Sequence, residues 1–362
     1  MLTKVGKLRL NEVGQYFKGR YSSLTGATYD HKKIKIITSY NICIMQSAEC
    51  FLSGYFPTTQ QEIWNPYVHW QPIPVHTIPP QYDNIIHFSK KCPINDQLTR
   101  KFYETSTEVK NICREYKSFF NYIERNSGLN LHPCEEVHTF RNLQTIYQIF
   151  AEDNTTFNIT LPSWVKSIYP EPVTSIVGRT FLLQVNDPQI KKIFSGPFFR
   201  LLLSEMKAKV NKSTSVPRLH LFSARAETLI TFMRTLNVYD NVVPPFGSSL
   251  GFELRQKNDD NYYITLMYTN STEKEPYLIE IPECGTYCTL QNFETILSSI
   301  IPKNWNNICE GSSDESLKEM EALRSSQSEG RKSNPYIFAR GMGILSPSKT
   351  SIIALSAEKE KK

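Results

Sequence analysis

The stretch Leu219-His-Leu-Phe-Ser-Ala-Arg-Ala-Glu-Thr-Leu229 decides the fold class, because it joins a strand pattern directly to a helix pattern. Leu219 and Leu221 belong to the predicted strand. The residues that follow have the apolar spacing of a helix at Leu229, Ile230, Phe232, Met233 and Leu236. A strand-to-helix corner directs backbone N–H groups and the first helical side chains toward one point, where anions bind readily. The stretch therefore predicts an α/β fold with an anion site at this corner.

The composition excludes several other classes of protein. With 362 residues, 40% of them apolar, the chain can bury a core in one or two domains, and it has no apolar run that could span a bilayer. The net charge of +6 is spread out, and the clusters at 31–35 and 358–362 are typical of solvated faces, so no nucleic-acid partner is expected. The seven histidines, including His87 in a predicted loop, show no metal-ligand spacing, so neither a metal nor a cofactor is expected.

The corner and several other blocks resemble the histidine acid phosphatases, in the branch that contains the prostatic, lysosomal and insect venom enzymes. In that family Ser-Ala-His-Asp-Thr-Thr-Leu occupies the corner, where this chain has Ser223-Ala-Arg-Ala-Glu-Thr-Leu229. The resemblance runs from Leu2 to about Cys309. Its other motifs include Trp70-Gln-Pro-Ile-Pro-Val-His-Thr77, Leu161-Pro-Ser-Trp164, Cys284-Gly-Thr-Tyr-Cys288 and Ile301-Pro-Lys-Asn-Trp305. Their order and spacing together identify the chain as a member of this family.

The resemblance implies an α/β sheet core that is flanked by helices and carries an inserted, mainly α-helical cap. Residues 1–91 and 206–309 are expected to form the discontinuous core, and residues 92–205 the cap that overhangs the pocket. Within the cap, periodic segments predict helices around 102–123, 138–150 and 190–206. Residues 310–362 have no counterpart in the family, and we expect them to be a mobile tail.

One element of the family fold has no match in this sequence. The first family strand is central in the sheet and ends in Arg-His-Gly-x-Arg, whose His is the nucleophile and whose two Arg hold the phosphate. No Arg-His-Gly occurs here, and a signal peptide would precede the same region. We therefore expect the first central strand to be missing, with unpaired backbone groups on its neighbours. An incomplete N-terminus is the favoured explanation, and a product that folds poorly alone is the alternative.

Catalysis in this family, as the resemblance implies, needs a neutral imidazole that attacks phosphorus and a ring of cations around the phosphoryl oxygens. Ile42 stands where the family has a phosphate-binding Arg, and an aliphatic side chain cannot replace that charged fork. Arg225 stands at the position of a His that contacts phosphate, and it keeps a cation there. The phosphate site is therefore altered in this chain, and only part of it is retained.

The proton donor has two interpretations. Ala226 replaces the usual acidic Asp. A related branch, the inositol polyphosphate phosphatases, carries His-Ala-Glu here with Glu as the donor, and Glu227 matches that Glu. The alternative is that Glu227 is a first-turn carboxylate stabilised by the helix dipole.

The eight cysteines are typical of a secreted protein. The resemblance implies a small loop disulfide between Cys284 and Cys288 and a long-range bridge between Cys92 and Cys309, the alternative being free buried thiols. Cys113 and Cys134 could pair, although the sequence does not decide it, and Cys43 and Cys50 are expected to be unpaired.

Sequons at Asn154, Asn158, Asn211 and Asn270 agree with a glycoprotein. The family implies a secreted or lysosomal location.

Three functions remain open at this point. The leading prediction is a histidine acid phosphatase homologue with impaired catalysis, a pseudoenzyme that still accepts a phosphomonoester or another small anion near Arg225. The second is an active acid phosphatase, if a missing N-terminus supplies Arg-His-Gly-x-Arg and Glu227 gives the proton. The third is a non-catalytic secreted binding protein. Family members often dimerise, so a homodimer is also an expectation.

Overall fold

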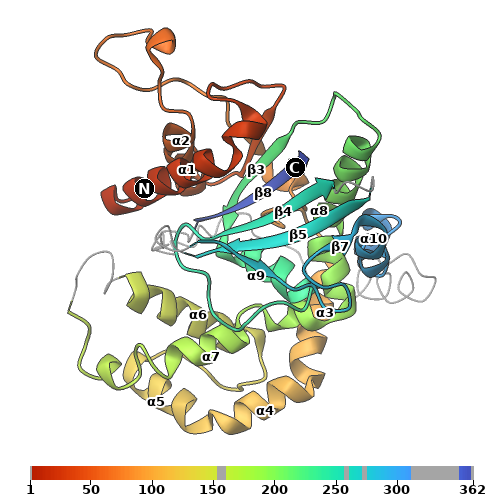
Figure 1. The fold of residues 1–362 in the computed structure, drawn as a ribbon. Helices are drawn as coiled ribbons and strands as arrows, with labels where there is room; N and C mark the ends of the chain where they lie inside the picture. The colour runs from red at the N-terminus through yellow and green to blue at the C-terminus, as the bar shows by residue number, and fades with distance from the viewer. Residues whose placement is uncertain (1, 153–159, 257–260, 271–274, 311–349, 360–362) are drawn as a thin grey trace, which may run out of the picture.

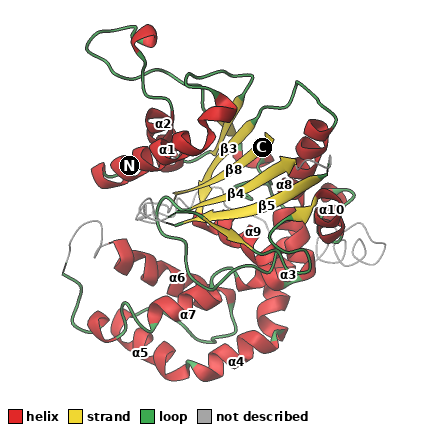
Figure 2. Cartoon of the chain, viewed as in Figure 1, coloured by secondary structure: helices red, strands yellow, loops and turns green. Residues whose placement is uncertain are grey.

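The computed structural model describes residues 2–152, 160–256, 261–270, 275–310 and 350–359, the last segment as backbone only. A central sheet is flanked by helices, and a largely helical region extends below it (Figure 1). Figure 2 shows the strands of this sheet in yellow and the surrounding helices in red. This is the mixed α/β architecture that the sequence predicts.

The sheet has the strand order β2-β1-β3-β8-β4-β5-β6, and β7 pairs with β5. The strands are β1 (Ile34–Ser39), β2 (His76–Ile78), β3 (Leu219–Arg225), β4 (Ser249–Gln256), β5 (Tyr262–Thr269), β6 (Tyr277–Ile279), β7 (Cys288–Thr289) and β8 (Thr350–Lys359). β1, β2 and β3 run parallel, so their carboxyl ends meet at one edge of the sheet.

The C-terminal strand β8 lies in the middle of the sheet. It pairs antiparallel with β3 over Leu219–Arg225 and parallel with β4 over Ser249–Gln256. The expectation of unpaired backbone groups on the central strands is therefore wrong, because β8 pairs with both β3 and β4. Residues 350–359 also differ from the predicted mobile tail, whereas residues 311–349 lie outside the described residues.

Helices α1 (Lys4–Thr25) and α2 (Ile42–Tyr55) cover one face of the sheet. The two helices approach so closely that a Cβ atom at Gly14 would lie 2.0 Å from the Phe51 carbonyl oxygen. A Cβ atom at Gly54 would lie equally close to the Asn11 carbonyl oxygen. Only glycine fits this contact, and the crossing brings the apolar faces of both helices onto β1 and β3.

Helices α8 (Pro188–Val210), α9 (Ala226–Thr235) and α10 (Leu290–Ser298) pack on the opposite face. Their cluster is rich in aromatic rings, and Phe198 stacks on Phe232 with 4.1 Å between ring centroids. Side chains of β3 alternate between the two faces: Leu219 and Leu221 face α1 and α2, whereas Phe222 and Ala224 face α8 and α9.

The helical region has its own hydrophobic cluster. It is formed mainly by α3 (Pro93–Thr105), α4 (Thr107–Glu115), α5 (Lys117–Ser127), α6 (Val137–Glu152) and α7 (Val173–Thr180). The periodic segment 102–123 is divided among three helices. Ser106 ends α3 and caps α4, and Tyr116 lies between α4 and α5. α8 falls inside the predicted cap range but packs with the sheet, so the boundary at residue 205 stays a prediction.

Three disulfides connect the chain: Cys92–Cys309, Cys113–Cys134 and Cys284–Cys288. The first of them ties the segment before α3 to the last short helix, α11 (Trp305–Glu310). Both bridges implied by the family resemblance are present, the pairing that the sequence left open is formed, and Cys43 and Cys50 are unpaired. Within the described ranges, no helix combines the length and the apolar character needed to cross a bilayer.

Glu253 joins α1 to the sheet through buried charged hydrogen bonds. It lies on β4, is 1% exposed, and accepts hydrogen bonds from Tyr21 at 2.6 Å and from Arg20 at 2.8 and 3.0 Å. Arg255 donates to its second carboxylate oxygen at 2.6 Å. Burial alone would raise the pKa of Glu253, but the Tyr21 hydrogen bond and the two guanidinium charges lower it below its ordinary value of 4.5.

We expect Glu253→Gln to lower the free energy of unfolding by about 2–3 kcal/mol, the usual value for a hydrogen bond to a buried charged group. Because the folded-state pKa is depressed, this contribution is present above about pH 4.5 and is lost as the pH falls further. Urea unfolding at pH 7 and pH 4 measures both effects. The matched control is Glu275→Gln, because the exposed carboxylate of Glu275 accepts a hydrogen bond from Tyr16, which lies on α1 as Tyr21 does. An equal loss of unfolding free energy in the two variants would contradict the stabilising role assigned to Glu253.

Candidate functional site

The corner between β3 and α9 is built as the sequence predicts. Arg225 ends β3 in an extended conformation and is the N-cap of α9, but its side chain makes no capping hydrogen bond. Ala226, the first helical residue, is buried, and Glu227 follows half-buried in the first turn. Among the residues that the structure describes, no group accepts a hydrogen bond from the first N–H groups of α9, and a guanidinium group lies near them, which favours an anion.

A second strand-to-helix corner lies at the same edge of the sheet, because β1 runs parallel to β3. After Ser39, the Asn41 side chain caps α2 by accepting hydrogen bonds from the N–H groups of Cys43 and Ile44 at 3.0 and 3.3 Å. Ile42 is the first residue of α2, and its side chain is 70% exposed. This corner thus presents an exposed aliphatic group where the family resemblance implies an arginine.

A row of hydroxyl residues crosses the sheet beside the two corners. The paired residues in this row are Thr77, Thr38, Ser223, then Ile352 of β8, Ser249 and Thr269. All the hydroxyl residues except Thr77 are buried. Among the residues that the structure describes, Ser249 Oγ and Thr269 Oγ1 have no hydrogen-bond partner, and neither has Ser39 Oγ one position further along β1. Such groups are rare in protein interiors, and they can bind a polar ligand.

Arg225 lies two residues beyond Ser223, so it continues the same face of β3 as the hydroxyl row. Its Nε atom is buried without a hydrogen-bond partner in the described parts of the chain. A guanidinium group can donate five hydrogen bonds in a planar fork that matches phosphate oxygens. The unused donor therefore supports the anion-binding role that the sequence predicts for Arg225.

The loop before α3 brings His87 to this corner. Asp83 Oδ1 accepts hydrogen bonds from the N–H groups of Ile85, Ile86 and His87 at 3.0 to 3.2 Å. Thr228, in the first turn of α9, donates its hydroxyl to the Ile86 carbonyl oxygen at 2.6 Å. Burial and the nearby charge of Arg225 lower the pKa of His87, and the Asp83 carboxylate opposes this shift only in part.

The structure brings only some of the predicted residues together. Arg225, Ala226 and Glu227 are consecutive at the α9 corner, and Ile42 lies at the neighbouring corner. The sequence did not predict that His87 lies at this corner, because a loop residue without periodicity or a motif gives no signal of its position. Within the described ranges, no group of three or more His, Cys, Asp or Glu residues is arranged to hold a metal ion.

The predicted glycosylation sites are only partly visible. Asn211 and Asn270 are exposed, as an acceptor must be. Asn154 and Asn158 lie outside the described residues.

The chain belongs to the histidine phosphatase superfamily, branch 2, whose family model matches residues 1–269. It is 29% identical to the lysosomal acid phosphatase of Rattus norvegicus, over 86% of this chain and 73% of that protein. It is 28% identical to the prostatic acid phosphatase of Homo sapiens, over 85% of this chain and 78% of that protein. The activity of this family is phosphomonoester hydrolysis.

Solved structures support the same fold. The phytase from Citrobacter braakii aligns with a TM-score of 0.58 at 14% identity, over 85% of this chain and 89% of that one. The Hafnia alvei phytase in complex with tartrate gives a TM-score of 0.59 at 13% identity, over 85% and 88% of the two chains. At these identities the likeness shows the fold alone.

The pKa of His87 leads to a prediction for anion binding. Burial and, after it, the Arg225 charge hold the pKa of His87 down; an anion beside Arg225 offsets the second of these causes, so binding should raise that pKa and take up a proton. Sulfate affinity should therefore increase as the pH falls from 7.5 to 5.5, by at most about tenfold per pH unit. Titration calorimetry of wild type and His87→Gln measures this slope, and sulfate is chosen because its own charge does not change in this range.

In His87→Gln the affinity should become nearly independent of pH. His69→Gln, which removes an exposed loop histidine, should keep the wild-type slope. An unchanged slope in His87→Gln would contradict the placement of this imidazole at the anion site.

Proposed function

We propose that this protein binds phosphomonoesters at the α9 corner and hydrolyses them poorly or not at all. The observation that carries the proposal is the Arg225 guanidinium, held at an uncapped helix N-terminus beside buried hydroxyl groups. In this arrangement Arg225 and the first N–H groups of α9 bind the phosphoryl oxygens, and the hydroxyls of the row add neutral hydrogen bonds.

Two positions support the impaired chemistry. Ile42 offers no charge to the phosphoryl group, and loss of one charge-assisted contact in the transition state costs roughly 3 kcal/mol, or about two powers of ten in rate. Ala226 is buried and has no proton to give, in place of the usual acidic residue. The remaining groups favour binding more than turnover.

The second candidate is slow hydrolysis with Glu227 as proton donor. It is favoured by the position of Glu227 in the first turn of α9, half-buried and two residues after Arg225. A carboxylic acid at that position could protonate a leaving alcohol. This route still requires a nucleophile, and the sequence has no Arg-His-Gly motif to supply the one that the family uses.

We also propose a secreted or lysosomal location for the protein. Three disulfides are typical of oxidising compartments. The exposed Asn211 and Asn270 are acceptable positions for glycans. The lysosomal and prostatic names of its relatives agree with this location.

Phosphate binding tests the main proposal. Arg225→Ala should weaken binding of inorganic phosphate by roughly tenfold or more, because it removes a charge-assisted hydrogen-bond donor. Arg218→Ala, an exposed arginine just before the opposite end of β3, should leave binding unchanged. Titration calorimetry measures both variants, and equal binding in wild type and Arg225→Ala would contradict the assigned site.

Turnover of p-nitrophenyl phosphate at pH 5 separates the two candidate functions. Impaired chemistry predicts rates well below the roughly 1–1,000 per second typical of enzymes. Ile42→Arg should raise the rate only if the other catalytic groups are in place, and Glu227→Gln should then abolish the gain. A wild-type chain that already turns over at ordinary enzyme rates would exclude the impaired-enzyme proposal.

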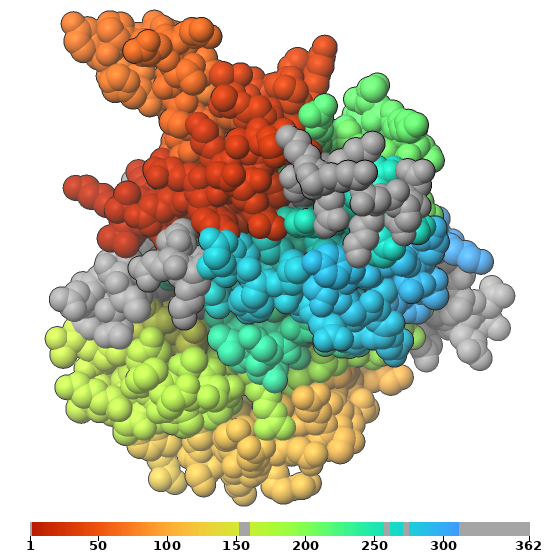
Figure 3. All heavy atoms as spheres, viewed as in Figure 1, coloured from red at the N-terminus to blue at the C-terminus, as the bar shows by residue number. Residues whose placement is uncertain are grey.

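A homodimer is a further proposal, and the segment between α2 and β2 supports it. This segment projects from the body of the molecule beyond α1 and α2 (Figures 1 and 3). It exposes three large aromatic side chains: Trp64 is 60% exposed, Tyr67 91% and Trp70 45%. An exposed apolar patch of this kind marks a contact surface, and a second copy could cover it.

We expect the double variant Tyr67→Ser, Trp70→Ser to shift the protein from dimer to monomer, because it removes apolar area from the contact. Sedimentation velocity measures the change. Tyr82→Ser, which removes a tyrosine that lies outside the segment and is 65% exposed, should leave the dimer intact. A monomeric wild type at about 100 μM would contradict the proposal.

A further inference from the structure

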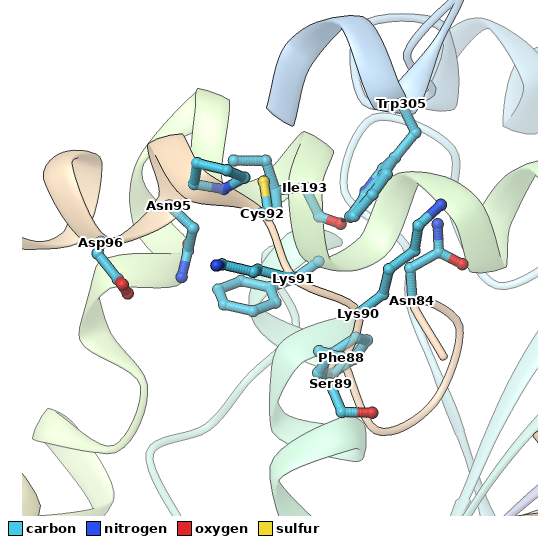
Figure 4. Close-up of a pocket in the computed structure, with 12 residues that line it drawn as sticks. Asn84, Phe88, Ser89, Lys90, Lys91, Cys92, Asn95, Asp96, Ile193 and Trp305 are labelled. Atoms are coloured by element: carbon cyan, nitrogen blue, oxygen red, sulfur yellow. Dashed lines mark hydrogen bonds between the residues drawn. The ribbon is translucent and has the colours of Figure 1, made fainter. Parts of the chain in front are cut away.

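A cavity of about 210 Å³ lies between the loop 84–92, the start of α3, α8 and α11 (Figure 4). Its lining includes neither Arg225 nor Glu227 nor any member of the hydroxyl row. The cavity is therefore separate from the phosphate corner, although the same loop carries His87. It is smaller than the roughly 300–1,000 Å³ of pockets for drug-sized ligands, so it suits a ligand with a single ring.

Several interactions hold the walls of this cavity in place. The Cys92–Cys309 disulfide ties the loop to α11, and Trp305 Nε1 donates a hydrogen bond to the Ile193 carbonyl oxygen at 2.9 Å. Lys90 donates to Asn306 Oδ1 at 3.0 Å and lies 4.6 Å from the centre of the Trp305 ring. The cavity is thus formed by the folded chain itself, which lowers the cost of ordering it around a ligand.

The cavity combines apolar walls with an available cation. Phe88, Phe194 and Trp305 supply aromatic surface, and the first two rings meet edge to face at 5.3 Å. In Figure 4 the Lys91 ammonium lies on the side of Asn95, away from Trp305. No residue in the described parts of the chain forms a hydrogen bond or an ion pair with Lys91, whereas Lys90 already contacts Asn306 and Trp305.

Two further polar groups narrow the ligand chemistry. Asn95 Oδ1 is buried and has no hydrogen-bond partner among the described residues, so it can accept from a ligand O–H or N–H group. The lining contains two lysines and one carboxylate, Asp96. This balance suits a singly charged anion better than a phosphate dianion, because Asp96 repels the second negative charge.

We propose that this cavity binds a small carboxylate that carries an aromatic ring and a hydroxyl group on the carbon next to its acid group. The ring lies against Phe194 and Trp305, the carboxylate pairs with the Lys91 ammonium, and the neighbouring donor bonds to Asn95 Oδ1. Binding at this site is independent of the phosphate corner and involves no covalent step.

Titration calorimetry on the full chain tests the proposal with three matched probes. Mandelate has the ring, the acid and the adjacent hydroxyl, mandelamide lacks the charge, and phenylacetate lacks the hydroxyl. We expect saturable mandelate binding, with each of the other probes weaker by roughly three- to tenfold. Lys91→Gln should lower the affinity for mandelate to that for mandelamide, and should leave the affinity for mandelamide unchanged. Asn95→Ala should bring the affinities for mandelate and phenylacetate to the same value.

Two controls separate this site from the rest of the molecule. Lys110→Gln, an exposed lysine on α4, should not change mandelate binding, and neither should Arg225→Ala. Lys91 is exposed, so its variant should keep the wild-type melting temperature. The proposal is overturned if mandelate does not bind at concentrations up to about 10 mM, if Lys91→Gln weakens both probes equally, or if Arg225→Ala removes mandelate binding.

Discussion

The position of β8 is the constraint on which the rest of the sheet depends. β2, β1 and β3 form one half of the sheet, and β4, β5 and β6 form the other. Within the described chain the halves are not paired with each other directly, and β8 joins them. Without it, the inner edges of β3 and β4 would have unpaired backbone groups in a buried location, which proteins avoid. The last strand in sequence is therefore central in the structure.

The anion corner depends on this sheet for its geometry. β3 places Arg225 at the edge, and its parallel pairing with β1 brings the starts of α9 and α2 to the same side. The hydroxyl row runs through β8 to Ser249 and Thr269, so these groups share a face with Arg225 only while β8 is in place. A cation, the N-terminus of α9 and buried hydroxyls then meet at one edge, which favours binding of a phosphoryl group.

The spacing of apolar residues along the sequence predicted the single strands and helices that it determines. The alternation in Leu219 to Ala224 and the helical spacing after Glu227 gave the α9 corner, because burial on two faces requires those residues. The place of His87 was not predictable, since it is set by Asp83 and by the Thr228 hydroxyl, which is distant in sequence. The central place of β8 was also missed, because strand order depends on long-range pairing that leaves no periodic signal. The loss of a charge at Ile42 and of an acid at Ala226 could be predicted from the sequence, whereas the arrangement of the other residues around them could not.

Hydrogen exchange of the backbone amides tests the central place of β8 most directly. A strand paired on both sides should exchange only when the sheet opens. We therefore expect the amides of Thr350–Lys359 to be protected to the same degree as those of β3 and β4. Exchange of these residues at the rate of an unfolded peptide, with β3 and β4 still protected, would contradict the account.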